Sequence, residues 1–247
     1  MSASSHYVVF GGTGSVGSAL ASQLLQQGHQ VTLGVRDPSR AAALATSEHC
    51  HVCEVDALHP ATLEACLKEA DSRATIQGVA NCMGSVLLKP AHLTTDDEWH
   101  SVINVNLTSS FAVIRGAAKL LRRHGGSVVL VSSAAAEIGL SNHEAIAAAK
   151  AGISGMVRSA AATYAPRGIR FNAVSPGLVK SEMTRKLWET EEAAAMSAQM
   201  HALGRLGDPS DVADAIAWLL NPATSWVTGQ TIGVDGGLGS VLTRMKM

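Results

Sequence analysis

Short apolar runs alternate with longer amphipathic stretches along this chain. The runs have the length of buried strands, and the stretches between them repeat apolar residues at helical spacing. The runs occupy residues 7–10, 29–35, 52–55, 76–82, 127–133, 169–174 and 231–234, and the main helical stretches occupy 60–70, 94–122, 143–165 and 209–220. This alternation predicts an α/β fold with a doubly wound, parallel, seven-stranded sheet and helices on both faces.

A glycine-rich turn separates the first apolar run from the first helical stretch. It reads GGTGSVG, and its candidate cofactor-binding residues are Gly11, Thr13, Gly14, Ser15, Val16 and Gly17. Glycine permits a tight turn and lets backbone N–H groups approach a pyrophosphate at the N-terminus of the following helix. Between a strand and a helix, this pattern predicts a dinucleotide-binding Rossmann fold.

The residues after the second strand bear on which dinucleotide binds. An acid there would bind the ribose 2′-OH of NAD, whereas an arginine accommodates the 2′-phosphate of NADP. Arg36 follows the strand and Arg40 lies one helical turn later, while Asp37 is expected to cap the turn that Pro38 begins. We therefore predict that the cofactor is NADP(H). Asp56 follows the third strand, next to Ala57, and we expect both beside the adenine; a solvated turn aspartate is the alternative.

Composition and charge favour one globular domain over residues 1–247. Apolar residues make up 47% of the chain, and the net charge of −1 predicts neither a nucleic-acid nor a membrane partner. No apolar run has the length of a membrane span, and the N-terminus lacks the basic and apolar parts of a signal peptide. We therefore expect a cytoplasmic protein.

Four cysteines are present, and Cys50 and Cys53 have the CxxC spacing of some metal and redox sites. The stretch has the character of a strand, however, and strand residues three apart point to opposite faces. No second CxxC occurs in the sequence. We therefore expect buried thiols in a reducing cytosol and no metal site.

Further patterns follow the glycine turn in a fixed order. They are Asp56, Asn81-Cys82-Met83-Gly84, Asn104-Val105-Asn106-Leu107, Ser132-Ser133, Lys150, Ser175-Pro176-Gly177 and Gly229…Asp235-Gly236-Gly237. With these, the chain resembles the short-chain dehydrogenase/reductase family over essentially its whole length, nearest to the acyl-carrier-protein ketoreductases. The resemblance implies further cofactor contacts from Asn81, Gly84, Lys150, Pro176, Gly177, Val179 and Ser181.

The catalytic set of that family is asparagine, serine, tyrosine and lysine. By resemblance, the asparagine is Asn106, the serine is Ser133 and the lysine is Lys150. The tyrosine is expected four residues before the lysine and thirteen after the serine, and both spacings fall on Ile146. Isoleucine cannot transfer a proton, so the site would lack the usual general acid of the family.

His143 is the candidate replacement for the missing acid. It precedes Ile146 by three residues and Lys150 by seven, which places all three on one helix face. An imidazole can donate a proton near neutral pH; a cap histidine without a chemical role is the alternative. If no acid is present, an activated C=C bond is easier to reduce than an isolated ketone, because Ser133 and Lys150 can hold the enolate while water protonates it.

The sequence leaves three functions open. The first is an NADPH-dependent oxidoreductase that reduces a carbonyl or activated C=C bond of a mainly apolar small molecule. The others are a non-catalytic NADP(H)-binding sensor and a structural partner subunit. Residues 180–203 have helical spacing and are expected to form a lid over the substrate pocket. By resemblance, helices 94–122 and 143–165 would form the interface of a homo-oligomer, either a tetramer or a dimer.

Overall fold

The computed structural model describes residues 4–242, whose strands form a seven-stranded sheet. All strands are parallel, in the order β3-β2-β1-β4-β5-β6-β7. The strands are β1 (His6–Phe10), β2 (Gln30–Val35), β3 (Cys50–Glu54), β4 (Ile76–Asn81), β5 (Gly126–Val131), β6 (Ile169–Pro176) and β7 (Thr231–Val234). The predicted doubly wound α/β fold is confirmed.

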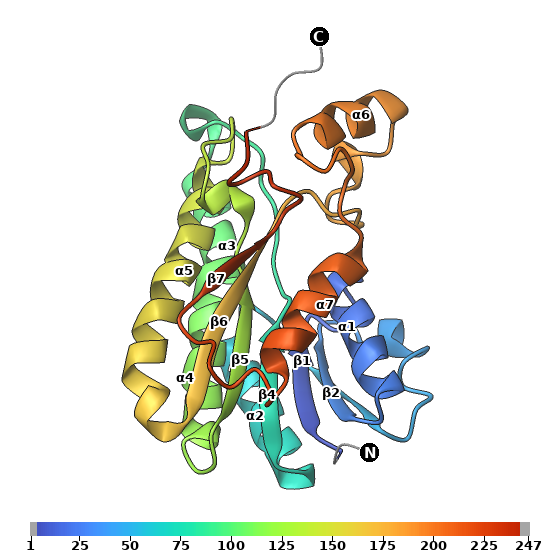
Figure 1. Ribbon diagram of the computed structural model, residues 1–247, viewed down its shortest axis with the longest axis vertical. Coiled ribbons are helices and arrows are strands. Elements are labelled where there is room, and N and C mark those ends of the chain that lie inside the picture. The colour runs from blue at the N-terminus through green and yellow to red at the C-terminus, as the bar shows by residue number, and fades with distance from the viewer. Residues whose placement is uncertain (1–3, 243–247) are drawn as a thin grey trace.

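Helices cover both faces of this sheet (Figure 1). They are α1 (Ser15–Gln26), α2 (Pro60–Arg73), α3 (Asp96–Ile103), α4 (Ser109–Leu121), α5 (Glu144–Tyr164), α6 (Glu191–Gln199) and α7 (Pro209–Leu220). Helices α1 and α7 pack on one face, and α2, α4 and α5 pack on the other, whereas α6 lies apart from both layers. In the described part of the chain, no helix is both long enough and apolar enough to cross a membrane.

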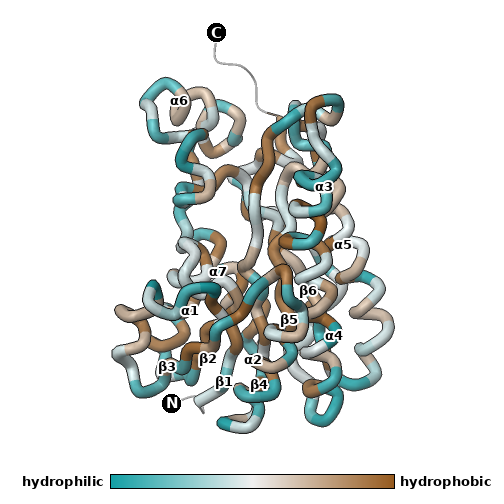
Figure 2. The backbone as a smooth tube through the Cα atoms, turned by 180° about the vertical axis from the view of Figure 1, so that it is seen from behind, coloured by the Kyte–Doolittle hydropathy of each residue, from teal (hydrophilic) through white to brown (hydrophobic). Residues whose placement is uncertain are grey.

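The strands carry apolar side chains on both faces of the sheet, because helices cover each face. In β1, Val8 and Phe10 belong to the core under α2, α4 and α5, whereas Tyr7 and Val9 belong to the core under α1 and α7. Figure 2 shows the apolar colour along these central strands. The alternation of side chains along one strand therefore supplies two cores rather than one.

The helix expected over 94–122 is present, but it is not regular. It begins with a capping box in which Thr95 and Glu98 bond each other's backbone N–H groups. Residues Asn104–Thr108 then form a π-helical turn between α3 and α4. Such turns are frequent at functional sites, and this one holds Asn106.

The segment 180–203 is less helical than its spacing predicts. Only Glu191–Gln199 forms an α-helix (α6), and Arg185–Leu187 forms a short 3₁₀ turn. No residue of α6 is fully buried, so the segment lacks the tertiary packing that stabilises longer helices. The helical spacing of residues 180–203 therefore corresponds to an α-helix over only part of the segment.

Strands β1 and β4 are neighbours at the centre of the sheet, although β2 and β3 follow β1 in the chain. The strand order therefore reverses between them. In doubly wound sheets, the ligand crevice forms outside the carboxyl ends of the strands at this point. The residues that follow β1, β4 and β5 are consequently the ones to inspect for a site.

Candidate active site

The glycine turn after β1 has no room for side chains at two positions. Gly11 has a φ of +75°, and a Cβ there would lie 2.8 Å from the backbone carbon of Cys82. A Cβ on Gly17 would lie 2.2 Å from the carbonyl oxygen of Gly11. Both positions therefore require glycine, and the turn packs directly against the chain that leaves β4.

Helix α1 begins straight after this turn without a side-chain cap. Its N-cap residue is Gly14, which offers no side chain to the N–H groups of the first helical turn. Those groups form the positive end of the helix dipole and can bind an anion. The turn is thus a cradle that fits a pyrophosphate, and Thr13, Ser15 and Val16 lie along it.

The carboxyl end of β2 carries positive charge. Arg36 and Arg40 are both exposed there. Asp37 accepts hydrogen bonds from the backbone N–H and the hydroxyl of Ser39, at 3.0 and 2.6 Å, and so caps the 3₁₀ turn as predicted. Because Asp37 is engaged in its own turn, the two arginines are the groups left to meet a charged ligand.

Asp56 is held in the turn between β3 and α2. One carboxylate oxygen accepts a hydrogen bond from the Leu58 N–H (2.9 Å), and the other bonds Nδ1 of His59 (2.8 Å). These bonds, that of Leu58 first, hold the pKa of Asp56 below its ordinary value. The contacts are those of a turn aspartate, and the adenine contact of Asp56 and Ala57 stays a prediction.

Asn81, at the end of β4, is a buried structural residue. Its side-chain nitrogen donates to the Ser110 hydroxyl (3.1 Å), and its Oδ1 accepts from the Met83 N–H (3.1 Å). These bonds connect the strand end to α4 and shape the loop that follows. They position this loop against the glycine turn.

Asn106 connects the π-helical turn to the same loop. Its side-chain nitrogen donates to the Val102 carbonyl oxygen (2.9 Å) and to the Ser85 hydroxyl (3.0 Å), and its Oδ1 accepts from the Ser85 N–H (3.2 Å). A Cβ on Gly84 would lie 3.1 Å from Oδ1 of Asn106 and 3.5 Å from Nζ of Lys150. Asn106, Gly84 and Lys150 are therefore brought together, although they lie far apart in the sequence.

Lys150 is the buried charge of this site. The residue is 6% exposed, and its Nζ donates to the Val131 carbonyl oxygen at 2.8 Å. Burial lowers the pKa of its ammonium group to about 8. Burial also raises the pKa of the nearby Cys82 thiol to about 12, so that Cys82 stays neutral and does not balance the lysine charge.

The two serines after β5 make different contacts. Ser132 is buried, and its hydroxyl donates to the Lys150 carbonyl oxygen (2.9 Å), which ties the strand end to α5. Ser133 is half-buried, and its hydroxyl oxygen accepts from the Ala135 N–H (3.2 Å). The hydroxyl hydrogen of Ser133 remains available to a ligand, so Ser133 is the serine suited to bind a substrate oxygen.

Ile146 lies one helical turn before Lys150 and is 4% exposed. It belongs to an apolar cluster with Val102, Ala145 and Ala149, against which Leu87, Ile103 and Leu107 pack. The cluster joins α5 to α3 and to the loop after β4. At this point of α5, the site is closed by hydrocarbon and not by a hydroxyl.

His143 is the N-cap residue of α5, and its Nδ1 donates to the Ser141 carbonyl oxygen at 2.7 Å. A carbonyl can only accept, so Nδ1 carries a hydrogen and Nε2 is the atom that can take up or release a proton. Seven helical residues separate His143 from Lys150, or about 10 Å along the axis. His143 would therefore act on a substrate and not on Lys150.

The loop after β6 is fastened to the segment 180–203 by His201. This residue is 4% exposed; its Nε2 accepts from the Leu178 N–H (3.1 Å), and its Nδ1 donates to the Ser197 carbonyl oxygen (2.8 Å). A Cβ on Gly177 would lie 2.7 Å from Nε2 of His201, so the imidazole needs glycine there. The sequence offered no sign of this role beyond a lone histidine at the end of an amphipathic stretch.

The same loop contains Val179 and Ser181, and a second polar residue, Thr184, ties them together. The Thr184 hydroxyl donates to the Val179 carbonyl oxygen (2.6 Å), and its oxygen lies 2.9 Å from the Ser181 hydroxyl. The loop that begins at Pro176 is thus a braced turn. It can hold a cofactor amide at a defined place.

Known proteins match this chain over most of its length. Residues 11–239 match the family model described as enoyl-(acyl carrier protein) reductase. The 3-oxoacyl-[acyl-carrier-protein] reductase FabG of Vibrio harveyi is 32% identical over 238 residues, which cover 94% of this chain and 96% of that protein. The chain belongs to the short-chain dehydrogenase/reductase family. It is an oxidoreductase of that family.

Solved structures of other proteins have the same fold. A short-chain type dehydrogenase/reductase from Mycobacterium ulcerans is 26% identical, with a TM-score of 0.90 over 95% of this chain and 90% of that one. ElxO with NADP bound is 23% identical, with a TM-score of 0.90 over 96% of this chain and 100% of that one. The second likeness shows the fold alone.

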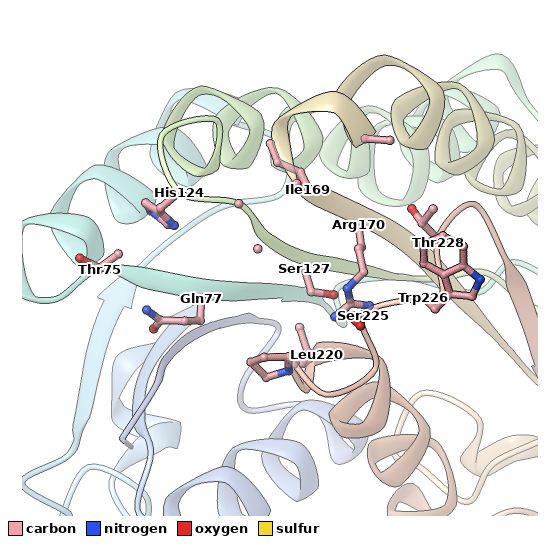
Figure 3. Close-up of a pocket in the computed structure, with 15 residues that line it drawn as sticks. Thr75, Gln77, His124, Ser127, Ile169, Arg170, Leu220, Ser225, Trp226 and Thr228 are labelled. Atoms are coloured by element: carbon pink, nitrogen blue, oxygen red, sulfur yellow. The ribbon is translucent and has the colours of Figure 1, made fainter. Parts of the chain in front are cut away.

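A cavity of about 700 Å³ opens at the other end of the sheet of this short-chain dehydrogenase (Figure 3). Gln77, Ser127 and Arg170 line it, and each is the second residue of its strand. They therefore lie at the amino ends of β4, β5 and β6, whereas Asn106 and Lys150 lie at the carboxyl ends. The cavity is separate from the cofactor crevice of the family.

Proposed function

We propose that this protein is an NADPH-dependent oxidoreductase that reduces a carbonyl group or an activated C=C bond of a mainly apolar small molecule. One observation carries the proposal: Lys150 and Asn106 meet at Gly84, at the carboxyl ends of the central strands. Burying an ammonium group costs free energy unless a hydrogen-bond partner or an opposite charge replaces its hydration. In a sheet that also carries an anion cradle, a ribose and a reacting oxygen are the partners that fit.

The residues present also fit NADPH. The glycine cradle suits its pyrophosphate, and the exposed Arg36 and Arg40 suit the 2′-phosphate that distinguishes it from NADH. Further contacts with the cofactor would come from Asn81, Gly84, Lys150, Pro176, Gly177, Val179 and Ser181. When bound, NADPH supplies a hydride.

The chemistry of the proposed reaction depends on where the proton comes from. Ile146 lies where the family resemblance places a tyrosine, and its hydrocarbon side chain has no proton to give. Nε2 of His143 and water are the two remaining sources. Meanwhile the Ser133 hydroxyl and the Lys150 ammonium group can hold the negative oxygen. Forming an enolate requires a general acid less than forming an alkoxide does, because the enolate is the weaker base.

We propose further that the protein acts as a homo-oligomer, a tetramer or a dimer, through α3–α4 and α5. Phe111 is 50% exposed and Trp99 is 39% exposed on the outer surface of the first pair of helices. A sedimentation mass of one 25.5 kDa chain would contradict an oligomer. A single domain, a cytoplasmic location and the expectation of neither nucleic-acid nor membrane partners stay predictions from the sequence.

The test follows NADPH oxidation by absorbance with two panels of substrates, simple ketones and α,β-unsaturated carbonyl compounds. Calorimetry with NADPH runs alongside. Turnover of ketones would assign C=O reduction, and a saturated carbonyl product from the second panel would assign C=C reduction. Tight NADPH binding without turnover of either panel would contradict the proposal and favour a non-catalytic sensor or partner subunit.

A further inference from the structure

Three side chains of metal-binding type meet between β3 and α2, at the edge of the sheet, and Cys66 belongs to the same buried cluster as one of them, Cys53. His51 and Cys53 are two residues apart on β3 and so point to one face of the strand. Cys66 and Glu69 are three residues apart on α2 and so share a face of the helix. Cys50, the other half of the CxxC pattern, packs toward α1 and α7 on the opposite face of the sheet.

The ligand atoms are close enough to share one ion. Nε2 of His51 lies 2.7 Å from Oε1 of Glu69, and Sγ of Cys53 lies 3.6 Å from Oε2 of the same carboxylate. The ligand atoms of these three residues all lie within 4.8 Å of one another. Around a tetrahedral zinc ion, with bonds of about 2.0–2.3 Å, ligand atoms are roughly 3.3–3.8 Å apart. Small side-chain rotations would bring the three into that range.

Cys66 supplies a fourth potential ligand behind Cys53. Both thiols are buried in the core that α2 forms with the sheet. The thiolate is the form of cysteine that binds a metal. A bound ion would displace the proton of each thiol that it contacts.

The cluster is buried on one side and open on the other. Cys53 and Cys66 are 6% and 2% exposed, whereas the Glu69 side chain is 53% exposed. His51 lines a hollow of about 370 Å³ together with His49 and other polar residues. An ion can thus enter from solvent and reach thiols that are shielded from it.

We propose that His51, Cys53, Cys66 and Glu69 form a structural Zn²⁺ site. An imidazole, two thiolates and a carboxylate are the ligand types that zinc takes in four-coordinate sites. The site revises the expectation that these thiols serve only in packing. Its ion would join the edge strand β3, which has a strand neighbour on one side only, to α2 and would brace the turn between them.

The test uses the full chain, treated with a chelator under a metal-compatible reductant and then titrated with Co²⁺ and Zn²⁺. We expect one ion per chain, a thiolate-to-cobalt charge-transfer band in the near ultraviolet, and the visible bands of tetrahedral cobalt. Zinc should displace the cobalt and raise the melting temperature. Cobalt binding without a thiolate band, or no binding at all, would overturn the proposal.

Single substitutions locate the site. Cys53→Ser and His51→Gln should each weaken zinc binding more than about 100-fold, because even partners outside the ligand shell cost about 10–100-fold. Cys66→Ser should reduce the thiolate band by roughly half, since one of two thiolates is lost. Cys50→Ser and His49→Gln are the matched controls and should leave affinity unchanged.

Equal losses in Cys50→Ser and Cys53→Ser would contradict the assignment, because the two thiols lie on opposite faces of the sheet. Circular dichroism of the metal-free variants checks that they are folded. If a variant does not fold, the cobalt spectrum of the unaltered protein still decides whether thiolates bind the ion.

Discussion

The Nζ atom of Lys150 donates a hydrogen bond of 2.8 Å to the backbone carbonyl oxygen of Val131. The bond joins α5 to the end of β5 and holds the ammonium group below the turn that carries Ser133. One neutral acceptor does not replace the hydration of an ammonium ion, and burial therefore lowers the pKa of Lys150 to about 8. The site holds a lysine that loses its charge not far above neutral pH.

This lowered pKa predicts how stability depends on pH. In the unfolded chain, the Lys150 ammonium group has its ordinary pKa of 10.5. In the folded chain, its pKa is about 8, so Lys150 loses its proton at a lower pH. Folding thus carries a penalty below pH 8 that disappears as the pH rises to 10.5. Relative to the Lys150→Met protein, the free energy of unfolding of the unaltered protein should rise by up to about 3 kcal/mol across this pH range.

Urea denaturation of both proteins without NADPH, at several pH values in this range, measures that difference. The Lys150→Met protein serves as the control for every other group that titrates there, including the Cys82 thiol. A difference that does not change with pH would show that Lys150 has an ordinary pKa in the folded protein.

Gly17→Ala should damage the cradle. Its new Cβ would lie 2.2 Å from the Gly11 carbonyl oxygen, so the turn or the start of α1 must shift. We expect a loss of about 1–3 kcal/mol in stability, as for other overpacked sites, and a weaker affinity for NADPH. Thermal denaturation and calorimetry measure the two effects. Gly139→Ala, where no atom lies within 4 Å of the new Cβ, is the control and should change neither.

The choice of cofactor should depend on two exposed arginines. Arg36→Ala and Arg40→Ala should each raise the Kd of NADPH roughly 10- to 100-fold, since a hydrogen bond to a charged group contributes about 1.5–3 kcal/mol. The Kd of NADH should stay within about twofold, because NADH has no 2′-phosphate. Calorimetric titration with both cofactors checks this, and Arg122→Ala, exposed at the end of α4, is the control. Tighter binding of NADH than NADPH by the unaltered protein would contradict an NADP preference.

Ile146→Tyr tests whether the site keeps the geometry of a ketoreductase. A tyrosine there would offer a hydroxyl one helical turn before Lys150, whose charge favours its ionised form. Carbonyl reduction should rise about 10²-fold or more, the usual contribution of a positioned acid. Ile146→Phe separates the hydroxyl from the ring, because it changes the apolar packing in the same way. Equal rates for the two variants would exclude proton donation from this position.

His143→Gln tests the remaining acid. The amide of glutamine can replace the hydrogen bond to the Ser141 carbonyl oxygen but cannot deliver a proton at Nε2. If His143 is the donor, ketone reduction should fall about 10²-fold, whereas C=C reduction protonated by water should change little. Steady-state rates with one substrate of each kind measure this. Unchanged ketone reduction would remove His143 from the mechanism.

The sequence by itself determined the features that depend on neighbouring residues. The apolar runs marked all seven strands, because buried parallel strands need apolar side chains on both faces. The cap at Asp37 followed from a short polar side chain next to a helical start. The glycines at 11 and 17 followed from a turn that has no room for a Cβ.

Only the tertiary structure decided what happens where distant segments meet. Asn106 reaches Ser85 across 21 positions of the chain, and the π-helical turn that directs it there does not follow from local spacing. His201 bonds Leu178 across 23 positions, and in the segment 180–203 only Glu191–Gln199 forms an α-helix. The Cys53 side chain lies beside residues of α2 and not beside its CxxC partner Cys50, since alternate side chains of a strand point to opposite faces. Local sequence patterns specify helices and strands, whereas functional sites form from residues that only tertiary packing brings together.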